Sequence, residues 1–167
     1  MLNNLKARRD QEDGFTLIEL MVVVLIIAIL IAIAIPTFLG ARERAQDRAA
    51  QSSLRNALTA AKTAYTDNSD YSKSTSTDLP AIEPSLTYVA AGTASTDPKM
   101  VSVAVSNVVA SPADSQVWAA AVSSKSGKCF WMKDTATGGS AGTFYGPTGG
   151  TGTCTGTAAL GAAGSSW

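Results

Sequence analysis

The stretch Gly14-Phe15-Thr16-Leu17-Ile18-Glu19-Leu20, together with the apolar run Leu20–Ala41 that follows it, decides how the rest of the chain is organised. The run contains no ionisable side chain. As an α-helix rising about 1.5 Å per residue it would cover about 33 Å, which exceeds the roughly 30 Å of a bilayer's hydrocarbon core. The sequence therefore predicts a membrane-spanning helix near the N-terminus.

One acidic residue, Glu19, lies among apolar neighbours at the start of this run. Moving a carboxylate into hydrocarbon costs about 3 kcal/mol or more unless it is paired or reaches the headgroups, so acids within membrane segments are functional candidates. Position alone leaves two interpretations of Glu19. It either works within the apolar region or lies at the membrane edge and extends to the headgroups.

The sequence from Gly14 to Val24, preceded by a short charged segment, resembles the processing site and N-terminal helix of a type IV prepilin. The resemblance extends through Pro36 to about Tyr65. It implies that residues 1–14 are a leader peptide, which a membrane-bound prepilin peptidase removes on the cytoplasmic side by cutting the bond after Gly14. Glycine suits such a site because a residue without a side chain lets a protease approach the backbone closely.

Further residues acquire expected roles from this resemblance. Cleavage between Gly14 and Phe15 would make Phe15 the mature N-terminus, and its amino group is expected to be N-methylated. Glu19 is then expected to pair with the Phe15 amine of a neighbouring subunit as the helices bundle, which would neutralise both charges inside an apolar core. Pro36 removes one helical hydrogen bond, so it is expected to kink or loosen the helix during filament packing. A proline that the membrane helix simply tolerates is the alternative.

An ordinary secretory signal is another reading of this N-terminus, with cleavage near the small residues Gly40 and Ala41. The apolar run is longer than a signal core of about 7 to 15 residues, and a helical pattern continues past its end, which favours the prepilin interpretation. Basic residues flank the run on both sides, so the positive-inside rule does not orient the helix. The cytoplasmic location of the leader therefore rests on the resemblance.

Past Gly40 the helical pattern becomes amphipathic. Small or apolar residues recur close to the 3.6-residue period, at Ala41, Ala45, Ala49, Leu54, Ala57, Leu58, Ala61 and Tyr65. One helix is therefore expected from about Phe15 to Tyr65, with a transmembrane and assembly half over 15–41 and an amphipathic half over 42–66. The charges after the apolar run are expected to form a solvated face or an inter-subunit ion-pair zone; they are Arg42, Glu43, Arg44, Asp47 and Arg48.

Residues 67–167 are expected to form a globular head built on an antiparallel sheet. The strand-like segments are Leu86–Ala91, Met100–Val105, Val117–Val122 and Cys129–Lys133, with turn formers between them at Pro98, Pro112 and Gly127. A sheet packed on the outer half of the helix would bury both apolar surfaces at once. The predicted fold is α+β, a long N-terminal α-helix that is first membrane-spanning and then amphipathic, packed on a small antiparallel β-sheet in the manner of the type IV pilin lollipop.

The C-terminal stretch 138–164 is rich in Gly, Thr, Ser and Ala, which predicts a loop, or disorder unless something pins it. The expected pin is the cysteine pair, since Cys129 lies in the last predicted strand and Cys154 in the glycine-rich stretch. An even pair in an extracytoplasmic domain favours a disulfide, and many type IV pilins bound a C-terminal loop in this way; free thiols are the alternative. The threonines around Cys154 could accept O-linked sugars, an idea that rests on composition alone.

Composition argues against several classes of function. The 13 basic and 13 acidic residues balance to a formal net charge of zero, so bulk electrostatics predicts no specific nucleic-acid partner. The absence of histidine removes the usual general base and the commonest metal ligand. We therefore expect no catalytic residue and no cofactor. We also expect no metal site, because the cluster Asp67, Asn68 and Asp70 lacks the glycine and distal glutamate of an EF-hand.

The sequence is therefore interpreted as a pilin, a structural subunit that polymerises through its hydrophobic helix into a helical homo-oligomer. The expected partners are prepilin peptidase, the pilus assembly machinery, the cell membrane before assembly and other copies of the chain in an extracellular pilus. Adhesion, twitching motility and DNA uptake are the tasks that such a filament serves.

Two alternatives to the pilin interpretation stay open. One is a pseudopilin of a type II secretion or competence machine. The other is a membrane-anchored binding domain that never polymerises, for which Glu19→Ala would leave the quaternary state unchanged.

Overall fold

The computed structural model describes residues 14–106, 116–137, 141–147 and 150–167. Contacts along the chain separate two compact units, with the boundary after Ala41. The second unit, Arg42–Trp167, contains a sheet and the helical residues packed on it. Residues 1–13 of the predicted leader and the predicted turn at Pro112 lie outside the described residues.

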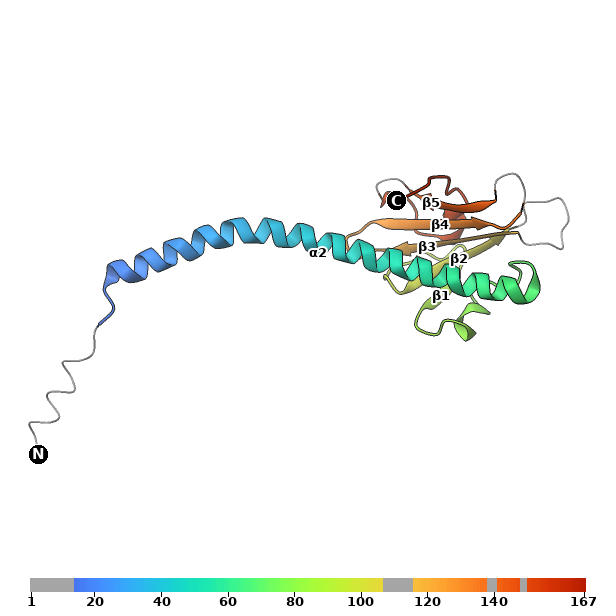
Figure 1. Ribbon diagram of the computed structural model, residues 1–167, viewed down its shortest axis with the longest axis horizontal. Helices are drawn as coiled ribbons and strands as arrows, with labels where there is room; N and C mark the ends of the chain where they lie inside the picture. Colours follow the sequence, from blue (N-terminus) through green and yellow to red (C-terminus); the bar gives the residue numbers. More distant parts are fainter. Residues whose placement is uncertain (1–13, 107–115, 138–140, 148–149) are drawn as a thin grey trace, which may run out of the picture. The chain divides into compact units, whose positions relative to one another are not determined.

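One helix, α2, spans Leu17–Asn68 (Figure 1). This confirms the prediction of a single long N-terminal helix. α2 runs unbroken through Pro36, and the following residue, Thr37, donates its side-chain hydroxyl to the Ile33 carbonyl oxygen at 3.1 Å. The helix therefore accommodates the proline without ending there, and a role for Pro36 in loosening the helix remains a prediction.

The end of α2 lies at Asn68, later than the predicted end at Tyr65. The Asn68 side-chain amide donates to the Ala64 carbonyl oxygen at 2.8 Å, which supplies a partner to one of the last carbonyls of the helix. The next residue, Ser69, has a φ of 58°, in the left-handed region that ends many helices. The turn-forming residues Asp67 and Asn68 thus belong to the last turn of the helix and not to the loop after it.

The second unit holds a five-stranded sheet in the order β1-β2-β3-β4-β5. The strands are β1 Thr87–Ala90, β2 Met100–Ser106, β3 Val117–Ser123, β4 Cys129–Thr135 and β5 Gly142–Gly146. The first four confirm the strands predicted from the sequence, with similar bounds. β5 was not predicted.

The predicted antiparallel sheet is confirmed for β2 to β5, and β1 adds a parallel strand at one edge. β1 pairs with β2 in parallel, with Thr87 opposite Met100, whereas the other pairs are antiparallel. Because β1 is only 4 residues long, the connection Ala91–Lys99 can return along it and start β2 beside its first residue. Ser95 anchors this connection, since its backbone N–H donates to the Cys154 carbonyl oxygen at 2.7 Å and its hydroxyl donates to the Met100 carbonyl oxygen at 2.6 Å.

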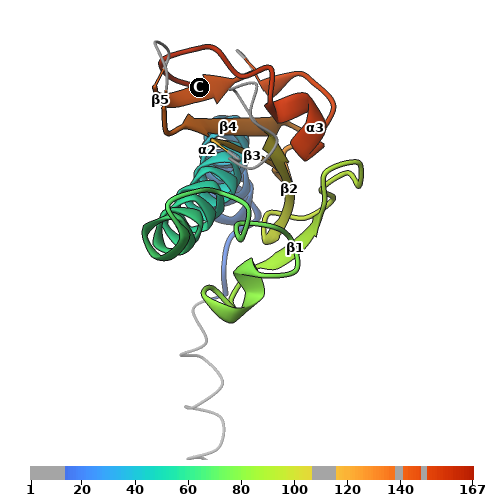
Figure 2. The ribbon, with the colours of Figure 1, turned by 90° about the vertical axis from the view of Figure 1, so that its right-hand side faces the viewer.

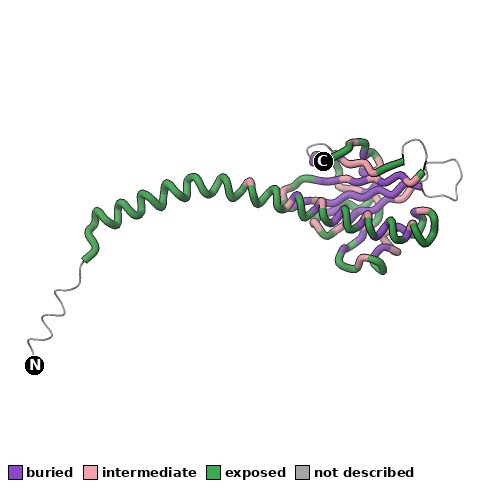
Figure 3. Tube along the Cα trace, viewed as in Figure 1, coloured by how far each residue is buried: buried purple, intermediate pink, exposed green. Residues whose placement is uncertain are grey.

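Different segments cover the two faces of the sheet (Figure 2). On one face, small and apolar residues of α2 pack against side chains from β2, β3 and β4; this cluster includes Ala50, Leu54, Ala57, Ala61, Val101, Val103, Trp118, Val122, Phe130 and Met132. On the other face, Ala119 and Ala121 of β3 pack with Ala159 near the C-terminus. β3 is apolar and buried from Val117 to Val122 (Figure 3). Because successive residues of a strand point to opposite faces, it contributes to the core on both sides of the sheet.

The C-terminal stretch is more ordered than its composition suggested. It contains β5 and a short helix, α3, over Gly156–Ala159. The Thr155 hydroxyl caps α3 by accepting a hydrogen bond from the Ala158 backbone N–H at 3.2 Å. The expectation of loop or disorder throughout 138–164 is therefore wrong for β5 and α3, while residues 138–140 and 148–149 lie outside the described part of the chain.

Gly156 explains how a glycine-rich stretch can be ordered here. A Cβ at this position would lie 2.6 Å from the backbone carbon of Val103 and 2.7 Å from the backbone nitrogen of Ala104, so only glycine lets α3 rest directly on β2. The Gly156 N–H also donates to the Ser102 hydroxyl oxygen at 2.8 Å. Glycine at a close contact and glycine in a flexible loop look alike in composition, which is why the sequence did not separate them.

Candidate functional site

The large apolar side chains of the first unit are exposed along its whole described length. Phe15 is 79 % exposed, Ile33 68 % and Phe38 68 %. The most apolar 18-residue window of α2 has a mean hydropathy of 3.3, and none of it is buried within the chain. By length and composition this helix can cross a membrane. A helix that is apolar on every side needs lipid or other helices around it.

The start of α2 is closed by a reciprocal pair of side chains. The Thr16 backbone N–H and hydroxyl donate to Glu19 Oε2 at 2.8 and 2.6 Å, and the Glu19 backbone N–H donates to Thr16 Oγ1 at 3.3 Å. This is a capping box, in which the residue before the helix and the third helical residue satisfy each other's backbone donors. Both bonds from Thr16 reach Oε2, so Glu19 Oε1 is left for another donor. Sequence reasoning missed this capping role, although the spacing Thr-x-x-Glu signals it.

The peptide bond between Gly14 and Phe15 precedes α2 and is exposed on both sides. A Cβ built at Gly14 would meet nothing within 4 Å among the described residues. Packing within this part of the chain therefore does not require glycine at position 14. A requirement for glycine there would come from a molecule that approaches this backbone from outside.

The predicted cleavage bond, the Glu19 carboxylate and the first turn of α2 thus lie together at one exposed apolar terminus. The family model of the prokaryotic N-terminal methylation motif matches residues 9–35. The chain carries the class III leader of type IV prepilins. This prepilin motif includes Gly14, Phe15 and Glu19 and ends immediately before Pro36. No curated protein and no solved structure matches the chain.

The prepilin leader implies processing by prepilin peptidase and handling by an assembly machinery. Together with the apolar helix, it fits membrane anchoring of a prepilin-type protein. The motif supports a type IV pilin-like or pseudopilin-like protein, and both classes share it. The roles of Gly14, Phe15, Glu19 and Pro36 remain predictions at the level of single residues.

The second unit is closed by a disulfide between Cys129 and Cys154, which are 25 residues apart in sequence with their Cα atoms 5.4 Å apart. The bond joins the first residue of β4 to the segment that leads into α3. The Trp131 indole N–H strengthens the same junction by donating to the Thr153 carbonyl oxygen at 3.0 Å. The cysteines therefore hold the C-terminal segment against the sheet, as a pair and not as free thiols.

Asp47 links α2 to the turn between β3 and β4. Its carboxylate pairs with Lys128 Nζ at 2.8 Å and accepts hydrogen bonds from the hydroxyls of Ser124 and Ser126. Burial opposes ionisation of Asp47, but the bonds from Lys128, Ser126 and Ser124 together outweigh it and lower the pKa of the carboxyl. From its charged neighbours in the sequence, Asp47 was predicted to lie in a solvated or inter-subunit zone. That placement is wrong for Asp47, which is buried and paired within the chain.

Proposed function

We propose that the mature chain is a structural subunit of a type IV pilus. The observation that carries the proposal is a prepilin leader followed at once by a helix whose apolar side chains are uncovered on every side. Lipid would cover this surface while the subunit waits in the membrane as a single-pass protein. In the filament, the helices of neighbouring copies would replace the lipid and form an apolar core.

Pairing of charges would set the register of that core. Cleavage after Gly14 creates an ammonium group on Phe15, and an unpaired charge in an apolar bundle is costly. Glu19 Oε2 already holds the helix start of its own chain through Thr16, and Oε1 would accept the Phe15 ammonium of a neighbouring copy. The favoured stagger between neighbouring helices is then the one that brings this amine and this carboxylate together.

The proposed role is structural and involves no catalysis. The assembled filament would lie on the cell surface and serve adhesion, motility or DNA uptake. A pseudopilin of a secretion or competence machine would share every step up to assembly. It would differ in forming short filaments and in causing a secretion or transformation defect when deleted.

The first test is intact mass and N-terminal sequencing of the protein sheared from the cell surface. The proposal expects a chain that begins at methylated Phe15, with two hydrogens missing for the Cys129–Cys154 bond. A chain that begins at Met1 and stays in the membrane fraction would contradict it and would favour the anchored binding domain.

The second test separates the two roles of Glu19. Glu19→Ala is expected to abolish the sheared filament fraction while leaving membrane insertion intact. Thr16→Val is the matched control, because it removes the hydroxyl of the capping box but keeps the carboxylate, and filaments should persist. Equal defects in both variants would mean that Glu19 acts only by capping its own helix, which contradicts the proposed pairing.

A further inference from the structure

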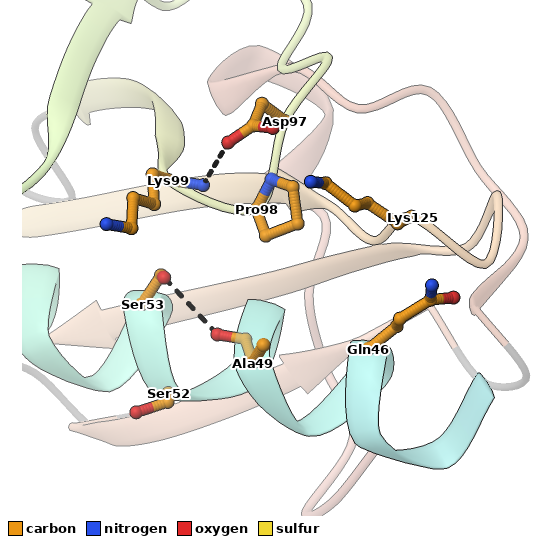
Figure 4. A pocket seen from close by; sticks show the side chains of 8 residues that line it. All are labelled: Gln46, Ala49, Ser52, Ser53, Asp97, Pro98, Lys99 and Lys125. Carbon is orange, nitrogen blue, oxygen red and sulfur yellow. Dashed lines mark hydrogen bonds between the residues drawn. The ribbon is translucent and has the colours of Figure 1, made fainter. Parts of the chain in front are cut away.

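An open groove lies beside α2 within the second unit, with a volume of about 470 Å³. Its floor is the α2 surface that carries Ala49, Ser52 and Ser53, and its opposite wall is the connection between β1 and β2 (Figure 4). The Ser53 hydroxyl donates to the Ala49 carbonyl oxygen at 3.2 Å, so it is already bonded within the helix. The floor therefore has short side chains and leaves room for side chains from outside.

The groove is edged by the lysines Lys99 and Lys125, whose side chains stand on either side of Pro98 (Figure 4). Both are exposed, and neither forms an ion pair with any residue that the structure describes. Lys62 and Lys128, by contrast, pair with Asp134 and Asp47.

One carboxylate, that of Asp97, also lies at the edge of the groove. It accepts a hydrogen bond from the Lys99 backbone N–H at 2.9 Å and forms no described ion pair with a lysine side chain. Two lysine side chains without a described ion pair therefore line the groove.

The complementary charge lies at the C-terminal end of α2, within the same unit as the groove. Asp67 is exposed and makes no described ion pair, and Asp70 follows it in the turn after the helix. Hydrogen bonds from Ser72 lower the pKa of Asp70, so this carboxylate is ionised at neutral pH. Lys73 lies close enough to contribute to that shift, and it is the cation at this end. Ala49 and Asp67 are about 27 Å apart along the helix at 1.5 Å per residue, so one chain cannot bring the two surfaces together.

We propose that the groove edged by Lys99 and Lys125 receives the Asp67–Asp70 turn of a second copy of this chain. This inference rests on the proposed function, since it requires copies that stand side by side in one orientation. Copies delivered from one membrane all point the same way. This excludes an antiparallel dimer, in which each copy would place its Asp67–Asp70 turn in the groove of the other. The contact is then heterologous, repeats from copy to copy and does not close, as an open filament requires.

The physical role of this contact is to set the register between neighbouring second units. Exposed charge pairs contribute more to orientation and partner choice than to affinity, and salt screens them over about 8 to 10 Å. Affinity would come from the apolar helices of the first units. Loss of the groove contact should therefore weaken and loosen filaments without abolishing processing or membrane insertion.

The test is a charge-reversal exchange in full-length protein, read as the yield of sheared filaments and as their dissociation at rising salt. Lys99→Glu with Lys125→Glu is expected to lower the filament yield about tenfold, because like charges then meet across the contact. Adding Asp67→Lys and Asp70→Lys to the same chain should restore the yield to within about twofold of the unchanged protein, since the attraction is rebuilt with reversed signs. Arg44→Glu with Arg48→Glu is the control, which changes the charge equally on the same helix outside the groove.

Each outcome decides a separate question. If the unchanged protein forms no sheared filament, the proposed function fails. If it forms filaments but the lysine reversals leave their yield and salt response unchanged, the groove proposal is overturned and the proposed function stands. If Arg44→Glu with Arg48→Glu lowers the yield as much as the lysine reversals do, the loss follows net charge and not the groove, which also overturns the proposal.

Discussion

At the scale of single residues, two carboxylates, Asp47 and Asp134, are buried and paired within the chain. Asp47 lies between charged neighbours that are exposed, such as Arg44 and Arg48, yet it is buried and holds the turn between β3 and β4. Asp134 lies at the end of β4, where it accepts a hydrogen bond from the Tyr71 hydroxyl at 2.5 Å and pairs with Lys62. The side of the element on which each carboxylate falls decides whether it is solvated or buried.

The lowered pKa of Asp47 predicts a specific dependence of stability on pH. A carboxyl whose pKa is depressed in the folded state stabilises the fold at pH values above its unfolded pKa, and it loses that contribution as the pH falls through the folded pKa. Asp47→Asn should therefore lower the free energy of unfolding by about 1 to 2 kcal/mol at pH 7 and by much less below pH 3. Urea unfolding of the full chain in detergent micelles at both pH values measures this difference.

The control for Asp47→Asn is Asp67→Asn, which removes an exposed carboxylate without described bonds and should leave monomer stability almost unchanged at both pH values. A destabilisation by Asp47→Asn that is equal at pH 7 and at pH 2.5 would contradict the role of the ionised form.

At the scale of elements, the C-terminal segment is the part whose order depends most on its neighbours. α3 has only four residues and cannot be stable alone. It is held by the disulfide before it, by Gly156 on β2, and by the Thr157 N–H and hydroxyl, which both donate to the Ala91 carbonyl oxygen at 3.0 Å. Tyr145 and Gly164 exchange backbone hydrogen bonds of 2.8 and 3.0 Å beyond α3, which covers part of the edge of β5.

Removing the disulfide should release this segment before the rest of the unit. With the cysteines 25 residues apart, the chain-entropy model assigns the bond about 3.5 kcal/mol. The variant Cys129→Ser with Cys154→Ser should lower the free energy of unfolding by about this amount, and the amides of Gly156–Ala159 should exchange faster. Amide exchange at Val101 and Val122 serves as the internal control and should change only through the global term. If the amides of Val101 and Val122 lost as much protection from exchange as those of Gly156–Ala159, the segment would not be docked separately from the rest of the unit.

Gly156→Ala tests the direct contact between α3 and β2. The added methyl would overlap the backbone at Val103 and Ala104, so we expect a loss of about 1 to 3 kcal/mol in stability. Gly92→Ala is the matched control, because a Cβ there meets nothing within 4 Å, and it should change stability by less than about 0.5 kcal/mol. Thermal unfolding of the two variants side by side measures the contrast. Equal stabilities would show that the segment is not held on β2.

At the scale of the whole molecule, the boundary after Ala41 separates residues that bury one another from residues that need an outside partner. In the second unit, Ala50 and Leu54 of α2 and Trp118 of β3 are fully buried in one shared core. In the first unit, the large apolar side chains from Phe15 to Leu39 contact mainly solvent. The chain therefore completes one core by itself and leaves an apolar surface that its own described residues do not bury.

This division predicts that residues 42–167 fold independently. We expect this fragment to be a soluble monomer that unfolds cooperatively, because every residue of the core cluster that the structure describes belongs to the second unit. Size-exclusion chromatography and thermal unfolding followed by near-UV circular dichroism measure both properties. Leu54→Ala in the same fragment should cost about 2 to 5 kcal/mol and so verifies that the transition reports this core. Aggregation of the fragment, or an unfolding curve without a cooperative transition, would contradict the division.

Features that depend on neighbouring positions in the chain were predictable from sequence. The long helix follows from an uninterrupted apolar run and a 3.6-residue pattern, and four strands follow from short β-rich segments between turn formers. The prepilin motif was recognisable because its residues lie next to one another. The capping box of Thr16 and Glu19 has a local signal as well, the spacing Thr-x-x-Glu.

Features that depend on residues far apart in the chain were not predictable. The parallel pairing of β1 with β2, the pairing of Asp47 with Lys128 and the groove edged by Lys99 and Lys125 each bring together residues that sequence spacing does not relate. β5 and α3 escaped prediction because their glycines and small residues have weak intrinsic preferences, and contacts with the sheet supply the order instead.

The sequence by itself thus determined the apolar helix, the processing motif and the α+β class, because local periodicity and adjacent residues carry that information. Only the tertiary structure decided which carboxylates are buried, how the C-terminal segment is held and where unpaired charge faces solvent. The physical reason is that burial and charge pairing are properties of surfaces in contact, and those surfaces exist only once the chain has folded.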